Sequence, residues 1–136
     1  VPRMDPGIAL PTFKAVHQAI CQGLVRSCHD LSEGGLAVAA AEMAFAGGLG
    51  LQLDVAGVSG EGGDRAALFA ESNSRFLCEV APQQVAAFQQ ALEGVPLTLL
   101  GEVVDDGQLT IEVDGQPLLQ RSLEELKEAW QRPLRW

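Results

Sequence analysis

One stretch of this chain, residues 35–46, is apolar around nearly its whole circumference if it forms a helix. Glu42 is the only charged residue in it, and Gly47 and Gly48 follow as a helix stop. A helix with almost no polar face is expected to lie in the interior of a protein rather than on its surface. The charge at Glu42 and the short length argue against a membrane span. The fold must therefore provide enough surrounding structure to bury this helix.

The composition permits such a core. The chain has 136 residues, of which 47% are hydrophobic and 20% charged, values typical of one soluble globular domain. A chain of this length buries roughly two-thirds of its unfolded surface. Nine basic and 18 acidic residues leave a formal charge of -9. This balance argues against nucleic acid and against an anionic membrane surface as partners, although a local anion site made of backbone amides stays open.

The remaining periodicity predicts an α/β protein of the α+β type, with helices packed on a mixed sheet. Residues 1–11 are predicted to be an extended linker or lead-in, and residues 12–136 a single domain. Asp106-Gly107 and Asp114-Gly115 predict hairpin turns that join the last three strands into an antiparallel meander. Ser122 and Glu125 form a capping-box pattern before a closing helix. The expected helices cover residues 12–23, 35–46, 64–71, 82–92 and 122–130, and the strands cover residues 24–28, 51–55, 75–80, 97–104, 109–113 and 116–120.

The three cysteines, Cys21, Cys28 and Cys78, are an odd number and show no CxxC spacing. This pattern disfavours a disulfide scaffold and a zinc site. We expect small, buried thiols in a reducing compartment. No basic and apolar leader opens the sequence, which favours a cytoplasmic location. Because the chain starts at Val1 rather than Met, we also expect a processed product or a piece of a longer protein.

The segment from His29 to Gly35 lies between a predicted strand and the apolar helix. Exposed amides at a helix start bind anions, and glycines allow a ligand to approach the backbone closely. The same residues are more typical of a helix cap, by Asp30 or Ser32, with close packing of the helix against the sheet. His29 beside Asp30 suggests acid–base chemistry, but a structural hydrogen bond is the more common role of such a histidine. No catalytic residue is assigned. The site candidates here are Asp30, Ser32, Gly34 and Gly35.

A second polar segment, residues 71–75, separates an apolar stretch from the strand that starts near Phe76. Arginine, two hydroxyls and a carboxylate are groups that hold a phosphate or a ribose. The alternative is a simple turn closed by an ion pair between Glu71 and Arg75. Acidic residues elsewhere lack calcium-loop spacing, so no metal site is assigned. The candidates in this segment are Glu71, Ser72, Ser74 and Arg75.

Three segments carry a resemblance to a known family. Residues 28–44 read CHDLSEGGLAVAAAEMA, residues 68–76 read LFAESNSRF, and residues 122–130 read SLEELKEAW. In this order they resemble the HD[LV]S[DE]GGLxVxxxEMA, LFxESxSRF and S[LV]xELxxAW patterns of phosphoribosylformylglycinamidine synthase. More specifically, the chain is similar to the C-terminal domain of the second aminoimidazole-ribonucleotide-synthetase-like half of the synthetase portion.

This resemblance implies part of an ATP-dependent ligase that converts formylglycinamide ribonucleotide, with ammonia from glutamine, to formylglycinamidine ribonucleotide. ATP and magnesium would serve the full enzyme, whose catalytic histidine and metal ligands belong to domains that this chain does not match. The implied partners are the N-terminal nucleotide-binding domains and a glutaminase subunit or domain. The fragment alone would be inactive, would act as a scaffold or as an auxiliary phosphate site, and could self-associate through an exposed apolar surface.

By pseudo-symmetry within the family, residues 71–75 would face a second nucleotide or phosphate. Asn73 and Ser74 depart from the pattern of the substrate-binding first half. Two alternatives remain open on sequence alone. The chain could belong to another member of the same superfamily, such as aminoimidazole ribonucleotide synthetase or a selenophosphate- or thiamine-phosphate-handling kinase. It could also be a non-catalytic, acidic interaction module.

Overall fold

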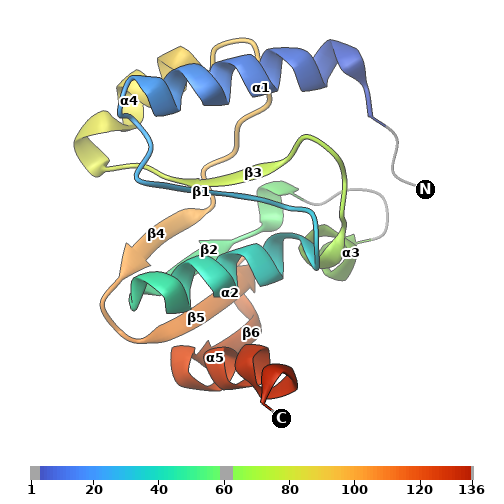
Figure 1. Ribbon diagram of the computed structural model, residues 1–136, viewed down its shortest axis with the longest axis vertical. Coiled ribbons are helices and arrows are strands. Elements are labelled where there is room, and N and C mark those ends of the chain that lie inside the picture. The colour runs from blue at the N-terminus through green and yellow to red at the C-terminus, as the bar shows by residue number, and fades with distance from the viewer. Residues whose placement is uncertain (1–3, 59–62, 136) are drawn as a thin grey trace.

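The computed structural model describes residues 4–58 and 63–135 (Figure 1). Its elements confirm the predicted α+β class with a mixed sheet. In chain order they are α1 (Pro6–Cys21), β1 (Ser27–Asp30), α2 (Gly35–Gly47), β2 (Gly50–Asp54), the 3-10 turn η1 (Ala56–Val58), α3 (Gly63–Phe69), β3 (Phe76–Glu79), η2 (Pro82–Gln84), α4 (Val85–Ala91), β4 (Gly101–Val104), β5 (Gln108–Val113), β6 (Gln116–Ser122), α5 (Leu123–Gln131) and η3 (Arg132–Leu134).

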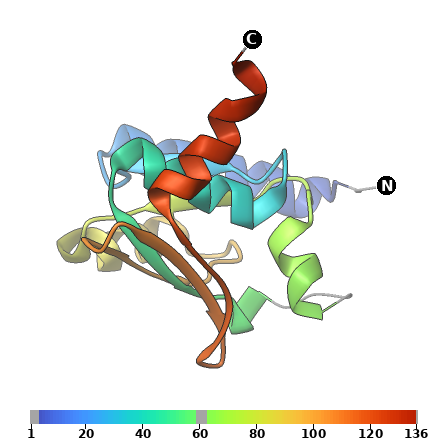
Figure 2. The ribbon, with the colours of Figure 1, turned by 90° about the horizontal axis from the view of Figure 1, so that it is seen from below.

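The apolar helix α2 is the centre of the main core. One side of it packs on the four-stranded sheet, and another side faces the two-stranded ribbon formed by β1 and β3 (Figures 1 and 2). Leu36 on the helix and Leu109 and Ile111 on β5 are at most 1% exposed. Helix α5 lies beside α2 on the same side of the sheet (Figure 2). This arrangement explains why the sequence leaves α2 almost no polar face.

The four-stranded sheet has the order β4-β2-β5-β6. β2 pairs antiparallel with β4 and parallel with β5, so it lies between two strands that follow each other in sequence. The predicted meander is therefore wrong at Asp106-Gly107, because this turn crosses over the end of β2 instead of closing a hairpin. Gly50 begins β2 at the crossing. A Cβ there would collide with the Asp106 carboxylate and lie 2.6 Å from the carbonyl oxygen of Gln108.

Two local predictions at the C-terminal end are confirmed. β5 and β6 form an antiparallel hairpin in which Val113 pairs with Gln116. Asp114 and Gly115 between them both have positive φ, 49° and 75°, as a type I′ turn requires. Ser122 and Glu125 form the full capping box at the start of α5. Both features depend on neighbours in sequence, which is why the sequence pattern was sufficient to predict them.

A second, smaller core lies on the other face of the β1–β3 ribbon. Ala19 of α1 and Phe88 and Leu92 of the α4 region are its buried residues. Along β3 the side chains alternate, with Leu77 against the main core and Cys78 against the smaller one. The ribbon therefore has α2 on one face and α1 and α4 on the other (Figure 1).

The first helix starts earlier than the sequence analysis predicted. Residues 6–11 belong to α1 and are not an extended lead-in, because Asp5 caps the Gly7 amide at 2.8 Å and Pro6 occupies the first turn. Thr12, where the helix was expected to begin, lies inside α1 and donates its hydroxyl to the Ile8 carbonyl. The boundary of the domain itself stays a prediction. Among the described residues, no helix has both the length and the apolar character needed to cross a membrane.

Candidate functional site

The two polar segments singled out in the sequence lie side by side at one end of the β1–β3 ribbon. The Gly34 amide donates to a carboxylate oxygen of Glu71 at 2.8 Å, although 37 positions separate the residues in sequence. The Leu31 amide donates to the Arg75 carbonyl oxygen at 3.1 Å, which extends the strand pairing into both segments. The chain thus brings a helix start and an arginine-bearing turn to the same place.

Gly35 allows the two segments to approach this closely. It is buried and has a φ of 66°, and a Cβ at this position would lie 2.8 Å from the Leu68 carbonyl oxygen and 2.9 Å from the Phe69 carbonyl carbon. The start of α2 therefore rests directly on the backbone at the end of α3. This is the close packing that the sequence analysis offered as the alternative to anion binding, and it fixes where the Gly34 amide points.

Glu71 acts as the cap of α2 from outside the helix. The N-cap residue Gly34 offers no side chain, and the Glu71 carboxylate accepts from the Gly34 amide, the N-cap N–H that a glutamate at the third helical position satisfies in a capping box. Its negative charge lies at the positive end of the helix dipole. The predicted alternative, an ion pair between Glu71 and Arg75, does not form among the described residues. Arg75 donates instead to the Ala70 carbonyl oxygen, at 3.4 Å.

Two polar side chains in the second segment, Ser74 and Arg75, are withdrawn from solvent with few or no hydrogen-bond partners among the described residues. The Arg75 guanidinium is half-buried, and this desolvation lowers its pKa from the ordinary value. The Ser74 hydroxyl oxygen is buried without a hydrogen-bond partner among the residues that the structure describes. Ser74 also holds a φ of 66°, which is costly for a residue with a side chain. Such features gather where a protein holds a ligand or another domain.

The other candidates are exposed. Asp30 ends β1, and a hydrogen bond from Ser32 is the main reason why the pKa of Asp30 is lowered. Ser32 and Ser72 both lie on the surface. Their side chains are available to a partner, whereas Gly34 and Gly35 contribute backbone only.

Sequence reasoning missed the role of Glu42. Its carboxylate accepts hydrogen bonds from the Trp130 indole at 2.8 Å and contacts His29 Nε2 at 2.9 Å. His29 Nδ1 lies 2.7 Å from the Asp30 carbonyl oxygen. β1, α2 and α5 are thereby tied together through one carboxylate, so His29 has the structural role that the sequence analysis favoured. The signal in the sequence was a single charge inside an otherwise apolar helix.

The environment of His29 makes stability depend on pH. Both ring nitrogens face acceptors, which only the imidazolium form can satisfy, so the Asp30 carbonyl and then Glu42 raise the pKa of His29 above 6.5. A raised pKa contributes stability that is full below the unfolded-state value and is lost as pH rises through the folded-state value. His29→Gln should therefore destabilise the chain more at pH 5.5 than at pH 9, as measured by urea unfolding at each pH.

The matched control for this prediction is His17→Gln, which removes a histidine from the exposed surface of α1. Subtracting its effect leaves the part due to the His29 environment. An equal loss of unfolding free energy at both pH values for His29→Gln would contradict the imidazolium interpretation.

The cysteines differ from the expectation of burial. Cys21 and Cys28 are exposed and Cys78 is half-buried, and all three are free thiols. The expectation was wrong because Cys21 is the exposed last residue of α1, and because Cys28 is one of the exposed residues that alternate with partly buried ones along β1. Within residues 4–58 and 63–135, no three histidine, cysteine or acidic side chains come together as metal ligands.

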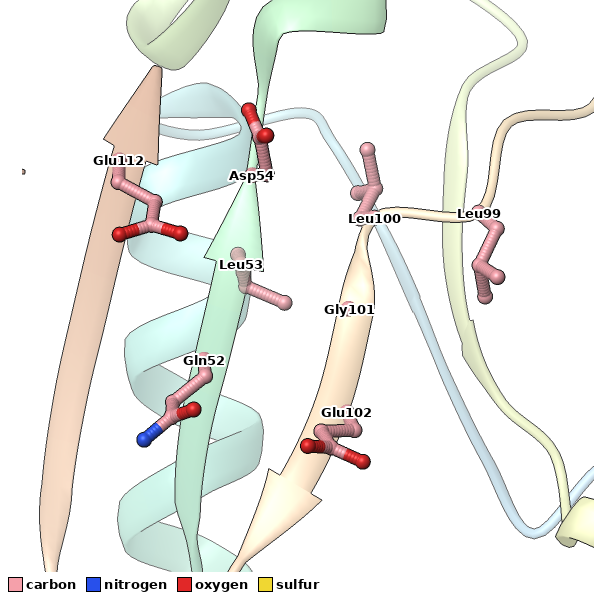
Figure 3. A pocket seen from close by; sticks show the side chains of 8 residues that line it. All are labelled: Gln52, Leu53, Asp54, Leu99, Leu100, Gly101, Glu102 and Glu112. Carbon is pink, nitrogen blue, oxygen red and sulfur yellow. The ribbon is translucent and has the colours of Figure 1, made fainter. Parts of the chain in front are cut away.

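An open cavity of about 350 Å³ lies elsewhere, on the four-stranded sheet (Figure 3). Figure 3 shows Glu112 on β5, Asp54 on β2 and Glu102 on β4, three carboxylates on adjacent strands. None of the predicted site residues lines it. Its acidic lining repels phosphate groups, so the cavity does not replace the paired segments as the candidate site.

Comparison with known proteins identifies a family model and a curated relative that both match most of this chain. Residues 2–114 match the family model described as AIR synthase related protein, C-terminal domain. The chain is 39% identical, over 99% of its length, to the phosphoribosylformylglycinamidine synthase subunit PurL of Deinococcus radiodurans, of which it spans only 18%.

Two solved structures share the fold. Thermotoga maritima PurL complexed with FGAR superposes with a TM-score of 0.82 at 19% identity, covering 93% of this chain and 22% of that one. The hydrogenase maturation protein HypE in complex with ATP gives a TM-score of 0.65 at 18% identity, covering 81% of this chain and 38% of that one. The chain thus spans between a fifth and two-fifths of these proteins. Since the family model covers well over half of its residues, the chain belongs to the family of AIR synthase related protein C-terminal domains.

Proposed function

We propose that this chain is the C-terminal domain of the second aminoimidazole-ribonucleotide-synthetase-like half of a phosphoribosylformylglycinamidine synthase. The parent enzyme would use ATP to convert formylglycinamide ribonucleotide, with ammonia from glutamine, to formylglycinamidine ribonucleotide. The observation that carries the proposal is the 39% identity to a PurL subunit across 99% of this chain. A cytoplasmic location goes with it, because three free thiols suit a reducing compartment.

Within that enzyme the chain would serve as a scaffold and as one wall of an auxiliary phosphate site. The support for this role is the contact between the two polar segments, where the Gly34 amide, the half-buried Arg75 and the unpartnered Ser74 hydroxyl gather near one end of the ribbon. An ATP or ADP phosphate there would receive hydrogen bonds from a helix-start amide and from a guanidinium. Magnesium would be held by other domains of the parent enzyme.

The proposed partners are the N-terminal nucleotide-binding domains and a glutaminase subunit or domain. Exposed apolar side chains along α1 support a docking role for this helix, and they also allow the isolated chain to self-associate. These side chains are Ile8, Leu10, Phe13 and Ile20, which are between 42% and 58% exposed.

A domain exchange tests the proposed function. The segment of the Deinococcus radiodurans PurL subunit that matches this chain is replaced by the 136 residues, and ligase activity is measured with a glutaminase or with ammonium as nitrogen source. We expect a chimera with activity within about tenfold of the parent. A second chimera carries the matching domain of HypE, which shares the fold at 18% identity to our chain, and should be inactive. A first chimera that folds and binds its partners but shows no turnover would refute the proposal.

The phosphate role has its own test, by titration calorimetry of the chain with ADP. Arg75→Ala should weaken binding by about tenfold or more, since it removes a charge-assisted hydrogen bond. Glu71→Gln should strengthen binding, because the Glu71 carboxylate now occupies the Gly34 amide that a phosphate would use. Glu33→Gln removes the same charge from an exposed residue of the neighbouring turn and should have a smaller effect. If neither the wild type nor any of the three variants binds ADP, the phosphate role is refuted and only the scaffold role remains.

A further inference from the structure

The two cysteines on the β1–β3 ribbon face each other directly. Cys28 and Cys78 are register partners in the antiparallel pair, and their sulfur atoms lie 3.6 Å apart. They are 50 positions apart in sequence, so no short spacing motif predicts the pair. Neither residue belongs to the candidate phosphate site.

The backbone geometry at this pair suits a disulfide. The Leu31 amide bonds to the carbonyl of its register partner Arg75, and hydrogen-bonded and non-hydrogen-bonded pairs alternate along an antiparallel ribbon. The Cys28–Cys78 pair is the third register pair along the ribbon from Leu31–Arg75, so the alternation makes it a non-hydrogen-bonded pair. The Cα atoms of such a pair are typically about 4.5 Å apart. A disulfide spans Cα separations of about 4.4–6.8 Å. The sulfur atoms can therefore reach bonding distance through side-chain rotation with little movement of the strands.

The two thiols are also chemically unequal. A hydrogen bond from Cys78 lowers the pKa of Cys28 to about 7, with a further contribution from the charge of His29. Cys78 keeps its proton as the donor, and that hydrogen bond together with burial raises the pKa of Cys78. Cys28 is exposed and Cys78 packs against the smaller core. Cys28 is thus the more acidic and more accessible thiol of the pair, and Cys78 is the more protected one beside it.

We propose that Cys28 and Cys78 are an oxidation site at which a hydroperoxide forms a reversible disulfide across the β1–β3 ribbon. The Cys28 thiolate attacks one peroxide oxygen, the O–O bond breaks, and a sulfenic acid and hydroxide result. The Cys78 sulfur then attacks the Cys28 sulfur. The S–S bond forms, the S–O bond breaks, and water leaves with the Cys78 proton. A dithiol reductant reverses the change by thiol–disulfide exchange.

The bond would fasten together the two strands that carry the candidate site. β1 leads into residues 30–35, and β3 follows residues 71–75. The disulfide closes a loop from residue 28 to residue 78, which includes α2, β2 and α3. Closing a loop of this size stabilises the folded chain by restricting the unfolded one. Oxidation should therefore raise the melting temperature by roughly 5–10 °C.

The experiment treats the full 136-residue chain with a small excess of hydrogen peroxide at pH 7, followed by alkylation and mass spectrometry. Alkylatable thiols should fall from three to one, and the mass should fall by two hydrogens. Trypsin cuts after Arg26, Arg65, Arg75 and Arg121, so Cys28 lies in peptide 27–65 and Cys78 in peptide 76–121. These two peptides should be cross-linked, and dithiothreitol should separate them.

Cys21→Ser is the matched control and should behave as the wild type, because the Cys21 sulfur contacts His17 and not the ribbon pair. Cys78→Ala should leave Cys28 to accumulate as sulfenic acid, detected with dimedone, and should abolish the rise in melting temperature. The mapping on the wild type needs no variant to fold. Three alkylatable thiols after treatment, a cross-link to Cys21, or disulfide-linked dimers would each overturn the proposal.

Discussion

Replacing Gly35 with alanine is expected to lower the free energy of unfolding by about 3 kcal/mol. Two causes add. The left-handed φ of 66° strains any residue with a Cβ, and the new methyl group would lie 2.8–3.0 Å from backbone atoms at the end of α3. Backbone cannot rotate away as a side chain can, so the start of α2 must shift. Urea unfolding followed by circular dichroism measures the loss.

Gly47→Ala is the matched control, since Gly47 ends the same helix and a Cβ there meets nothing within 4 Å. This variant should be neutral or should gain up to about 1 kcal/mol, the helix propensity of alanine over glycine. The phosphate titration described above should also weaken for Gly35→Ala, because the Gly34 amide moves with its neighbour. Equal unfolding free energies for the two variants would contradict the close-packing argument.

Replacing Leu109 with alanine should cost about 3–4 kcal/mol, the other large effect expected for this chain. Leu109 is fully buried near the start of β5, where the main core joins α2 to the four-stranded sheet. Truncation leaves a cavity between two rigid layers that cannot collapse to fill it. The melting temperature should fall by roughly 10 °C or more.

Leu99→Ala makes the same chemical change at a position that is 76% exposed and should alter the free energy of unfolding by less than about 0.5 kcal/mol. The pair of variants separates burial from residue type. A small effect at Leu109 would show that the sheet and α2 do not share one core.

The candidate site was only half visible in the sequence. The sequence marked two segments, one by its glycines after a polar turn and the other by an arginine among hydroxyls. These residue types indicate a candidate binding site from a short stretch of sequence alone. That Glu71 caps α2 at the Gly34 amide could not be read from the sequence, because nothing local connects residues 37 positions apart. The link between His29, Glu42 and Trp130 escaped for the same reason.

The order of the strands was also hidden. Alternating side chains predicted β2 and β5 correctly, because alternation records which face of a strand is buried. It does not record which strand lies next to which. β4 and β5 are neighbours in sequence, and a short turn of Asp and Gly normally closes a hairpin. Here β2 fits between them, and Gly50 provides the space for the chain to cross.

The sequence by itself determined the buried helix α2, the capped helix α5, the β5–β6 hairpin and the membership of a family. Each of these depends on periodicity, on turn chemistry or on motifs within a short stretch. Only the tertiary structure decided that α2 lies between a ribbon and a sheet, that two distant segments share one end of that ribbon, and that Cys28 faces Cys78. Such contacts arise when burial of apolar area outweighs the entropy of closing long loops, and that balance belongs to the whole chain.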